Sequence, residues 1–189
     1  MELAKGDLSP LGDALARYVR SGLADVEQEK SAILFESFLS AHADAFERSC
    51  APGHFTGSAW LVSLDGERVL LTHHRKLGLW LQPGGHADGD PNLCDVALRE
   101  AGEETGLRGL RIEPGIFDID RHRIPARPGE PEHWHYDVRY VVRAGEDECF
   151  IVSEESHSLA WRPVAEVAKD PQADASVRRM AAKWLARVG

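Results

Sequence analysis

Apolar residues recur at helical spacing over the first quarter of the chain, from about Pro10 to Arg48. Ser21-Gly22 interrupts the repeat, so the pattern predicts two helices. We expect residues 1–50 to form a helical extension ahead of a second unit that spans residues 51–189. The apolar positions are Leu11, Leu15, Tyr18 and Val19 in the first helix, and Val26, Ile33, Leu34 and Phe38 in the second.

After Pro52-Gly53 the apolar residues gather in short runs that are typical of strands. The runs Ala59–Val62 and Val69–Thr72 flank Asp65-Gly66, a dipeptide that favours a hairpin turn. Further strand candidates are Leu79–Leu81, Ile116–Ile119 and Tyr136–Val142.

A central helix is predicted from about Pro91 to Thr105, between the early and the late strands. Asp90 is a suitable N-cap, Pro91 a suitable first residue, and Gly106 stands where a C-terminal cap glycine belongs. Strands on both sides of a central helix indicate a mixed α/β (α+β) fold. A last helix would place one apolar face on Val177, Met180, Ala181, Trp184, Leu185 and Val188.

Composition favours a folded protein, since 43% of residues are hydrophobic and 28% are charged. The formal net charge of −9 argues against bulk attraction to nucleic acid or to an anionic membrane. Any handling of phosphate would therefore need local cations or a bound metal. No signal peptide or run of about 18 apolar residues is visible, and Cys50, Cys94 and Cys149 form no CxxC pair, so we expect a cytoplasmic protein without a membrane span.

Three carboxylates on the central helix are the strongest chemical signal. Glu100, Glu103 and Glu104 are related by three and four positions, which places them on one helical face. Like charges at this spacing repel one another, and a hard divalent cation such as Mg²⁺ would relieve that repulsion. The alternative is a solvated acidic face, and it is the neighbouring residues that argue against it.

These residues resemble the Nudix box, a pattern of Gly, five residues, Glu, seven residues, Arg-Glu, an aliphatic residue, any residue, Glu-Glu, any residue, Gly and an aliphatic residue. Ala101 is a mild departure at an aliphatic position, and Pro91 replaces the first glutamate. That glutamate typically helps to hold the box arginine, and Asp88, Asp90 and Asp95 are candidate substitutes. The matching residues are Gly85, Arg99, Glu100, Glu103, Glu104, Gly106 and Leu107.

The resemblance extends over roughly Phe55 to Val167, and Trp80–His86 (WLQPGGH) is similar to the lead-in of one Nudix subgroup. It implies the Nudix fold, a mixed β-sheet sandwiched between α-helices. It also implies a Mg²⁺ cofactor, for which Mn²⁺ often substitutes, and attack of water on a phosphorus of a nucleoside diphosphate derivative. The implied partner is a small nucleotide-type substrate, and a homodimer is left open.

The resemblance also implies roles for individual residues. Glu103 and Glu104 would bind metal, Glu100 would be a third ligand or act through water, and Gly85 would let its backbone approach the metal. Arg99 is the catalytic box arginine. The base that takes the proton of water would be a box glutamate or a loop glutamate, with Glu155 as the loop candidate, whose alternative is a polar turn.

Two further groups of polar residues are candidates for substrate contact. Arg75 and Lys76, after two histidines, form a local source of cations that suits phosphate, or else a solvated hairpin end. His133, His135 and Asp137 share a strand face and suggest three alternatives: a Zn²⁺ site, structural hydrogen bonding, or contact with substrate through His135.

Other function classes remain. A Nudix-fold ligand-binding or sensor module with little turnover would explain Pro91, but retention of the three glutamates and Arg99 favours a hydrolase. An isoprenyl diphosphate isomerase of a related fold group would need a cysteine and glutamate pair that we do not place in this sequence.

Overall fold

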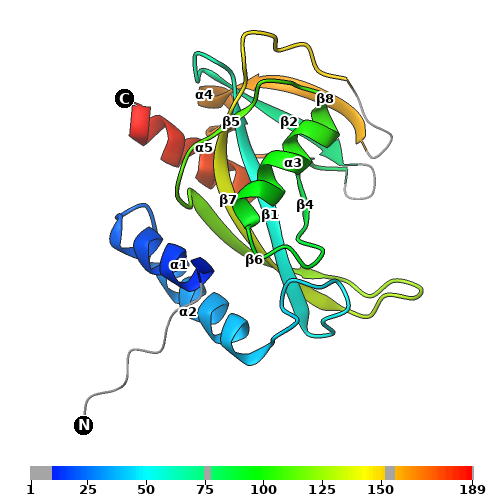
Figure 1. The fold of residues 1–189 in the computed structure, drawn as a ribbon. Coiled ribbons are helices and arrows are strands. Elements are labelled where there is room, and N and C mark those ends of the chain that lie inside the picture. The colour runs from blue at the N-terminus through cyan, green and yellow to red at the C-terminus, as the bar shows by residue number, and fades with distance from the viewer. Residues whose placement is uncertain (1–9, 75–77, 152–155, 189) are drawn as a thin grey trace.

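The computed structural model describes residues 10–74, 78–151 and 156–188 (Figure 1). Its centre is a mixed sheet, as the sequence predicts. Strands β1 and β7 run parallel at the middle of this sheet, in the order β3-β2-β1-β7-β5, while β4 pairs with β1, β6 with β7 and β8 with β2. The strands are β1 (Gly53–Val62), β2 (Arg68–His74), β3 (Trp80–Leu81), β4 (Gly84–His86), β5 (Arg111–Ile112), β6 (Asp118–Ile124), β7 (His133–Arg143) and β8 (Ser156–Pro163).

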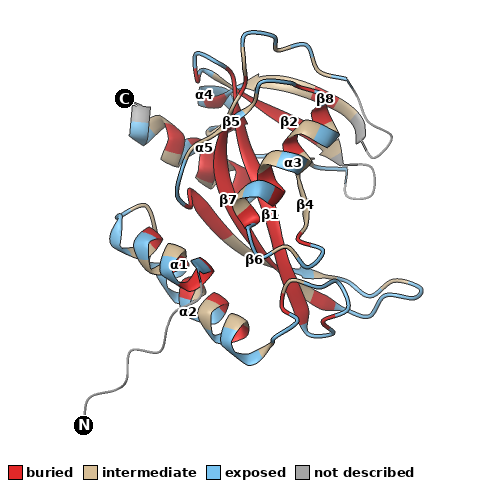
Figure 2. Cartoon of the chain, in the orientation of Figure 1, coloured by how far each residue is buried: buried red, intermediate tan, exposed pale blue. Residues whose placement is uncertain are grey.

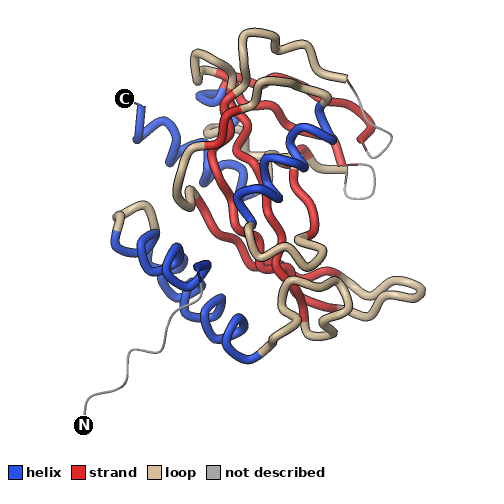
Figure 3. Tube along the Cα trace, viewed as in Figure 1, coloured by secondary structure: helices blue, strands red, loops and turns tan. Residues whose placement is uncertain are grey.

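Helices cover both faces of the sheet, so the predicted sandwich is confirmed (Figures 1 and 3). Helix α3 (Leu93–Thr105) packs on the face that carries Ala59 and Leu61. Helices α4 (Val164–Val167) and α5 (Ala175–Val188) pack on the opposite face, against Trp60. From Ala59 to Val62 the side chains of β1 thus alternate between two cores, and the strand is buried along its whole length (Figure 2).

The N-terminal pair α1 (Pro10–Arg20) and α2 (Val26–Ala41) confirms the two predicted helices. Phe35 and Phe38 of α2 pack edge-on and stacked against Tyr136 of β7, so the pair shares a core with the sheet. The expected apolar face of α2 was partly wrong, because Val26, Ile33 and Leu34 are 66%, 63% and 46% exposed. The unit boundary near residue 50 stays a prediction.

Several element boundaries differ from the prediction. β1 begins six residues before Ala59 and β7 begins at His133, because both strands continue through polar residues that an apolar pattern does not mark. The strand expected at Ile116–Ile119 is shifted to Asp118–Ile124 for the same reason. Helix α3 starts at Leu93 rather than Pro91, since the Asp90 carboxylate accepts a hydrogen bond from the Asn92 amide and holds a turn ahead of the helix.

The helix C-terminus is as predicted: Gly106 adopts φ 70° and its amide donates to the Gly102 carbonyl. The Asp65-Gly66 hairpin is confirmed by the antiparallel pairing of Val62 with Val69. No helix in the described part of the chain is both long and apolar enough to cross a membrane.

Close packing of α3 on β1 depends on Gly57. A Cβ atom at this position would lie 2.7 Å from the Leu93 carbonyl oxygen and 3.0 Å from Val96 Cγ1. We expect Gly57→Ala to lower the free energy of unfolding by about 1–3 kcal/mol, measured by urea denaturation, because the helix must move outward.

Gly102→Ala, on the open side of the same helix, is the matched control. A Cβ there meets nothing within 4 Å, so alanine should stabilise the helix by about 0.5–1 kcal/mol. Equal urea midpoints for the two variants would contradict the close-packing interpretation.

Candidate active site

The predicted carboxylates of α3 open into a cavity with a volume of about 1140 Å³. Glu100, Glu103 and Glu104 all line it, and so do Gly85 and Arg99. The helical spacing of the glutamates and the close approach of α3 to β1 therefore bring together the residues that the box pattern singled out.

Strand β4 lies directly against these carboxylates. The Gly84 amide donates a 2.8 Å hydrogen bond to Glu104 Oε1. A Cβ on Gly85 would lie 2.3 Å from Glu100 Oε2, so only glycine lets this backbone approach the carboxylate so closely. Strand β4 is itself anchored on β1, where Gly85 pairs with Gly57.

Arg99 is held without the glutamate that Pro91 replaces. Its guanidinium donates to the His86 carbonyl at 3.3 Å and to Glu100 Oε1 at 3.2 Å. The expected pair with Asp95 is not formed among the described residues, because the Asp95 carboxylate accepts a 2.6 Å hydrogen bond from Asn92. Glu100 and the His86 carbonyl thus hold Arg99 in this structure, where the pattern would have a glutamate at position 91.

Asp88 and Asp90 do not replace that glutamate at Arg99 either. Asp88 forms an ion pair with Arg48, which brings the segment after α2 to the cavity rim. This pair lowers the pKa of the Asp88 carboxyl, chiefly through the hydrogen bond from Arg48. Arg48 also lines the cavity, so the N-terminal part of the chain contributes a cation to the site.

The opposite wall consists of polar rows that run across three strands. In-register pairing of β1 with β7 and of β7 with β6 places directly opposed residues on the same face. In the order β1, β7, β6, the rows are His54, His135 and His122; then Thr56, Asp137 and Asp120; then Ser58, Arg139 and Asp118.

Asp137 lies at the middle of this wall. Its carboxylate accepts hydrogen bonds from Thr56 Oγ1 at 2.8 Å, Ser58 Oγ at 2.7 Å and Arg139 Nε at 2.7 Å. Asp137 shares the strand face of His133 and His135, as expected, but its carboxylate binds Thr56 of its own row and Ser58 and Arg139 of the next row instead of joining the histidines.

Asp118 connects this wall to the rest of the protein. It is fully buried and accepts hydrogen bonds from Gln28 of α2 at 2.6 Å and from Lys183 of α5 at 2.7 Å. It also pairs with Arg139 at 3.3 Å and Arg179 at 2.8 Å. Burial by itself raises the pKa of the Asp118 carboxyl, but the hydrogen bond from Arg179 and the charges of Arg139 and Lys183 hold that pKa below its usual value.

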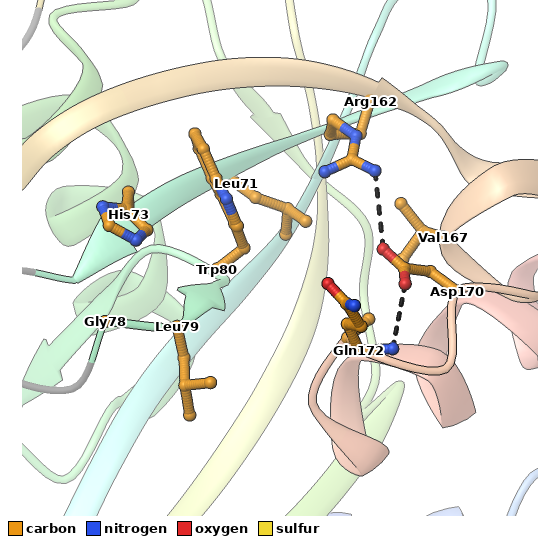
Figure 4. Close-up of a pocket in the computed structure, with 10 residues that line it drawn as sticks. Leu71, His73, Gly78, Leu79, Trp80, Arg162, Val167, Asp170 and Gln172 are labelled. Carbon is orange, nitrogen blue, oxygen red and sulfur yellow. Dashed lines mark hydrogen bonds and ion pairs between the residues drawn. The ribbon is translucent and has the colours of Figure 1, made fainter.

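His135 lines the same cavity, as expected for a substrate contact. The predicted residues Arg75, Lys76 and Glu155 lie outside the described residues. His73, which precedes the predicted cation source, lines a separate cavity of about 430 Å³ beside Trp80. An ion pair of 3.6 Å between Arg162 and Asp170 lies at one side of that smaller cavity, as the close-up shows (Figure 4).

The sequence search missed the cations and hydroxyls of the far wall. The signal was present as polar residues at every second position, as in His54, Thr56 and Ser58, a spacing that puts them on one strand face. The cavity-lining residues that were missed include Arg48, Thr56, Ser58, Gln82, Asp120, His122, Arg123, Arg127 and Arg139.

Known proteins resemble this chain over the same region. A family model for the NUDIX domain matches residues 54–184. A putative 8-oxo-dGTP diphosphatase 3 of Mycobacterium tuberculosis is 32% identical over 112 residues, which cover 57% of this chain and 50% of the relative. The m7GpppN-mRNA hydrolase NUDT17 of Xenopus laevis is 31% identical over 97 residues, or 48% of this chain and 33% of the relative. The chain thus spans a third to a half of the length of these curated relatives.

Solved structures share the fold. A NUDIX-family hydrolase from Clostridium perfringens superposes with a TM-score of 0.57 at 23% identity, over 72% of this chain and 98% of that one. A C. elegans Ap4A hydrolase complex superposes with a TM-score of 0.56 at 18% identity, over 71% of this chain and 96% of that one.

The buried charges at Asp118 yield a stability prediction. Asp118→Asn keeps the shape of the side chain and removes the charge that three cations share. We expect the free energy of unfolding to fall by about 3–5 kcal/mol in urea denaturation, since loss of one partner leaves buried charge uncompensated.

Glu27→Gln is the control, because it removes the charge of an ion pair with Lys30 whose side chains are 80% and 65% exposed. This variant should unfold like the wild type. A fall of less than about 1 kcal/mol for Asp118→Asn would mean that the network contributes little.

Proposed function

The chain belongs to the Nudix family, and from this premise we propose that it is a divalent-metal-dependent pyrophosphohydrolase acting on a nucleoside diphosphate derivative. The observation that carries the proposal is that three glutamates of α3 line one large cavity together with Gly84 and Gly85 of β4. Arginines on the cavity rim support phosphate as the ligand, because guanidinium groups bind phosphate oxygens.

The donor set fits a hard divalent cation. Glu103 and Glu104 would hold it, with Glu100 as a further oxygen donor, and carboxylate oxygens are the ligands that Mg²⁺ and Mn²⁺ prefer. Such a cation would neutralise charge on the phosphate oxygens and lower the pKa of water. The missing Cβ atoms let Gly85 lie directly against the Glu100 carboxylate and Gly84 directly against Ser58 of β1.

Residues of the chain would orient the reacting groups. Glu100 and the His86 carbonyl fix Arg99, and the Gly84 amide fixes one oxygen of Glu104. The proton of the attacking water would pass to a box glutamate or to Glu155, the two alternatives that the family resemblance offers. His135 would contact substrate from the opposite wall.

The substrate class follows from charge and from relatives. Relatives of this chain are named for action on 8-oxo-dGTP, DHNTP and m7GpppN-mRNA, and a structural neighbour is an Ap4A hydrolase. All four names describe a nucleoside or pterin joined to a phosphate chain. Arg48, Arg123 and Arg127 line the cavity and would meet such phosphates, but Arg48 and Arg123 are already paired with Asp88 and Glu132. In a chain of net charge −9, the bound cation would therefore have to supply part of the positive charge that the substrate needs.

Metal removal over a substrate panel tests the proposal. The purified chain should release phosphate or diphosphate from at least one of 8-oxo-dGTP, dihydroneopterin triphosphate, Ap4A or a capped dinucleotide. EDTA should abolish this turnover, and Mg²⁺ or Mn²⁺ should restore it. Full turnover in EDTA would refute metal dependence, while saturable binding without any turnover would instead support a ligand-binding module.

Neutral variants of the metal-facing glutamates test the site. Glu103→Gln and Glu104→Gln keep the shape of the side chain, and the amide oxygen of the second variant can still accept the hydrogen bond from Gly84. Each should lower kcat at least about 10²-fold, because a ligand or a positioned base is lost. Both should remain folded by circular dichroism.

Glu29→Gln is the matched control, since Glu29 is exposed on α2 outside the cavity. It should turn over substrate at the wild-type rate. If both α3 variants kept the wild-type kcat, Glu103 and Glu104 would be part of a solvated acidic face with no role in catalysis.

A further inference from the structure

Five histidine rings gather where β1, β4, β6 and β7 meet at one side of the cavity. The ring of His54 lies 5.0 Å from His86, 4.9 Å from His133 and 4.8 Å from His135, between ring centroids. His122 lies 5.4 Å from His135. The proposed hydrolase chemistry uses only His135 of this cluster, so the other rings call for a separate explanation.

Strand pairing creates the cluster. His54 and His135 are directly opposed in the parallel β1–β7 register, and His133 lies on the same face two residues before His135. One side-chain nitrogen from each of His54, His133 and His135 lies within 4.8 Å of the others. Three residues of two rigid strands therefore converge on a single point.

The hydrogen bond that His133 makes through Nδ1 leaves a lone pair on its Nε2, which faces that point. Its Nδ1 lies 2.9 Å from the Pro131 carbonyl oxygen, which only accepts, so Nδ1 carries the proton. In the neutral ring, Nε2 then has the lone pair, and it lies 3.3 Å from His135 Nε2. A backbone carbonyl that fixes the tautomer in this way is typical of histidines that bind metals.

His54 is the second indication of a missing ligand. It is 2% exposed, and neither ring nitrogen has a hydrogen-bond partner among the described residues. Buried polar groups normally have a hydrogen-bond partner, so the unpartnered nitrogens of His54 indicate a ligand that the strands themselves do not supply.

The protonation states agree with this geometry. Burial, together with the neighbouring histidines, lowers the pKa of His54 to about 4 and that of His135 to about 2. Both rings are neutral at physiological pH, and a neutral imidazole keeps the lone pair that a metal requires.

We propose that His54, His133 and His135 form a second cation site, for a transition metal of the Zn²⁺ class, separate from the carboxylates of α3. Zn–N bonds of about 2.0–2.1 Å in a tetrahedron put neighbouring nitrogens about 3.3–3.4 Å apart. The 3.3 Å between His133 Nε2 and His135 Nε2 already has this value. Imidazole selects Zn²⁺ and its neighbours, whereas Mg²⁺ prefers oxygen.

Glu130 is the nearest candidate for a fourth ligand. Its Oε1 lies 3.8 Å from His133 Nε2, and its carboxylate lines the cavity. With either Glu130 or water in that position, the metal would tie the start of β1 to the start of β7 beside the proposed substrate.

Cobalt provides a test that does not depend on turnover. The chain is stripped with a chelator, dialysed, and titrated with Co²⁺ in excess Mg²⁺, which occupies oxygen sites. We expect one equivalent of Co²⁺ with the visible absorption of a four-coordinate, nitrogen-rich site, and displacement of that Co²⁺ by Zn²⁺. Glu103→Gln should bind Co²⁺ like the wild type, which separates this site from the one in the proposed function.

Two ligand variants and a control complete the test. His54→Phe keeps the ring volume, and His135→Gln changes a half-buried side chain that the fold tolerates more easily. Each should weaken Co²⁺ binding at least about 100-fold, beyond the roughly 10–100-fold loss that follows when a group bonded to a metal ligand is removed. His73→Gln, in the separate smaller cavity, should bind normally.

The proposal is overturned if the stripped wild type takes up no Co²⁺ or Zn²⁺ in excess Mg²⁺. It is also overturned if His135→Gln, shown to be folded by circular dichroism, binds Co²⁺ as tightly as the wild type. If His54→Phe fails to fold, His135→Gln decides the outcome.

Discussion

The parallel register between β1 and β7 is the constraint on which the cavity depends. It runs without interruption from the pair Gly53 and Trp134 to the pair Val62 and Arg143. A shift by one residue would turn every side chain of one strand to the other face and would remove the polar rows from the cavity wall. The alternation of Trp60 and Leu61 between two separate cores fixes this register, because either shift would bury the polar set under α3.

Buried charged residues also connect the β1–β7 pair to the helices that surround the sheet. Arg139 is 2% exposed, and a guanidinium at that depth is tolerated only with compensating carboxylates, here Asp137 and Asp118. Asp118 in turn needs Gln28 and Lys183, and Lys183 also donates a 2.7 Å hydrogen bond to Tyr18. The N-terminal helices and α5 are thereby part of the support of the cavity wall, although neither region was assigned a chemical role from sequence.

Local patterns predicted the helical wall of the site, but of the strand wall they predicted only His135. The glutamates of α3 were predictable because helical spacing is a property of neighbouring residues. The rows of β1 and β7 join residues 81 positions apart, such as His54 and His135. Strand pairing between residues so far apart cannot be predicted from the residues next to them. Polar residues at every second position of both strands did mark a polar face. What they could not specify was which residues meet, and so Asp137 was grouped with His133 instead of with Thr56 and Ser58.

The two walls also differ in what they can bind, and this difference follows from the elements that form them. Helix α3 presents carboxylates at a solvated surface, with Glu103 exposed, where hard cations keep water and share phosphate oxygens. The strands present imidazoles, of which His54 and His133 are buried, and burial lowers the pKa of His54, which suits the nitrogen ligation that we propose. His86 stands between them, since its carbonyl orients Arg99 while its ring packs on His54. A change in the histidine cluster would therefore reach Arg99 through His86 of β4.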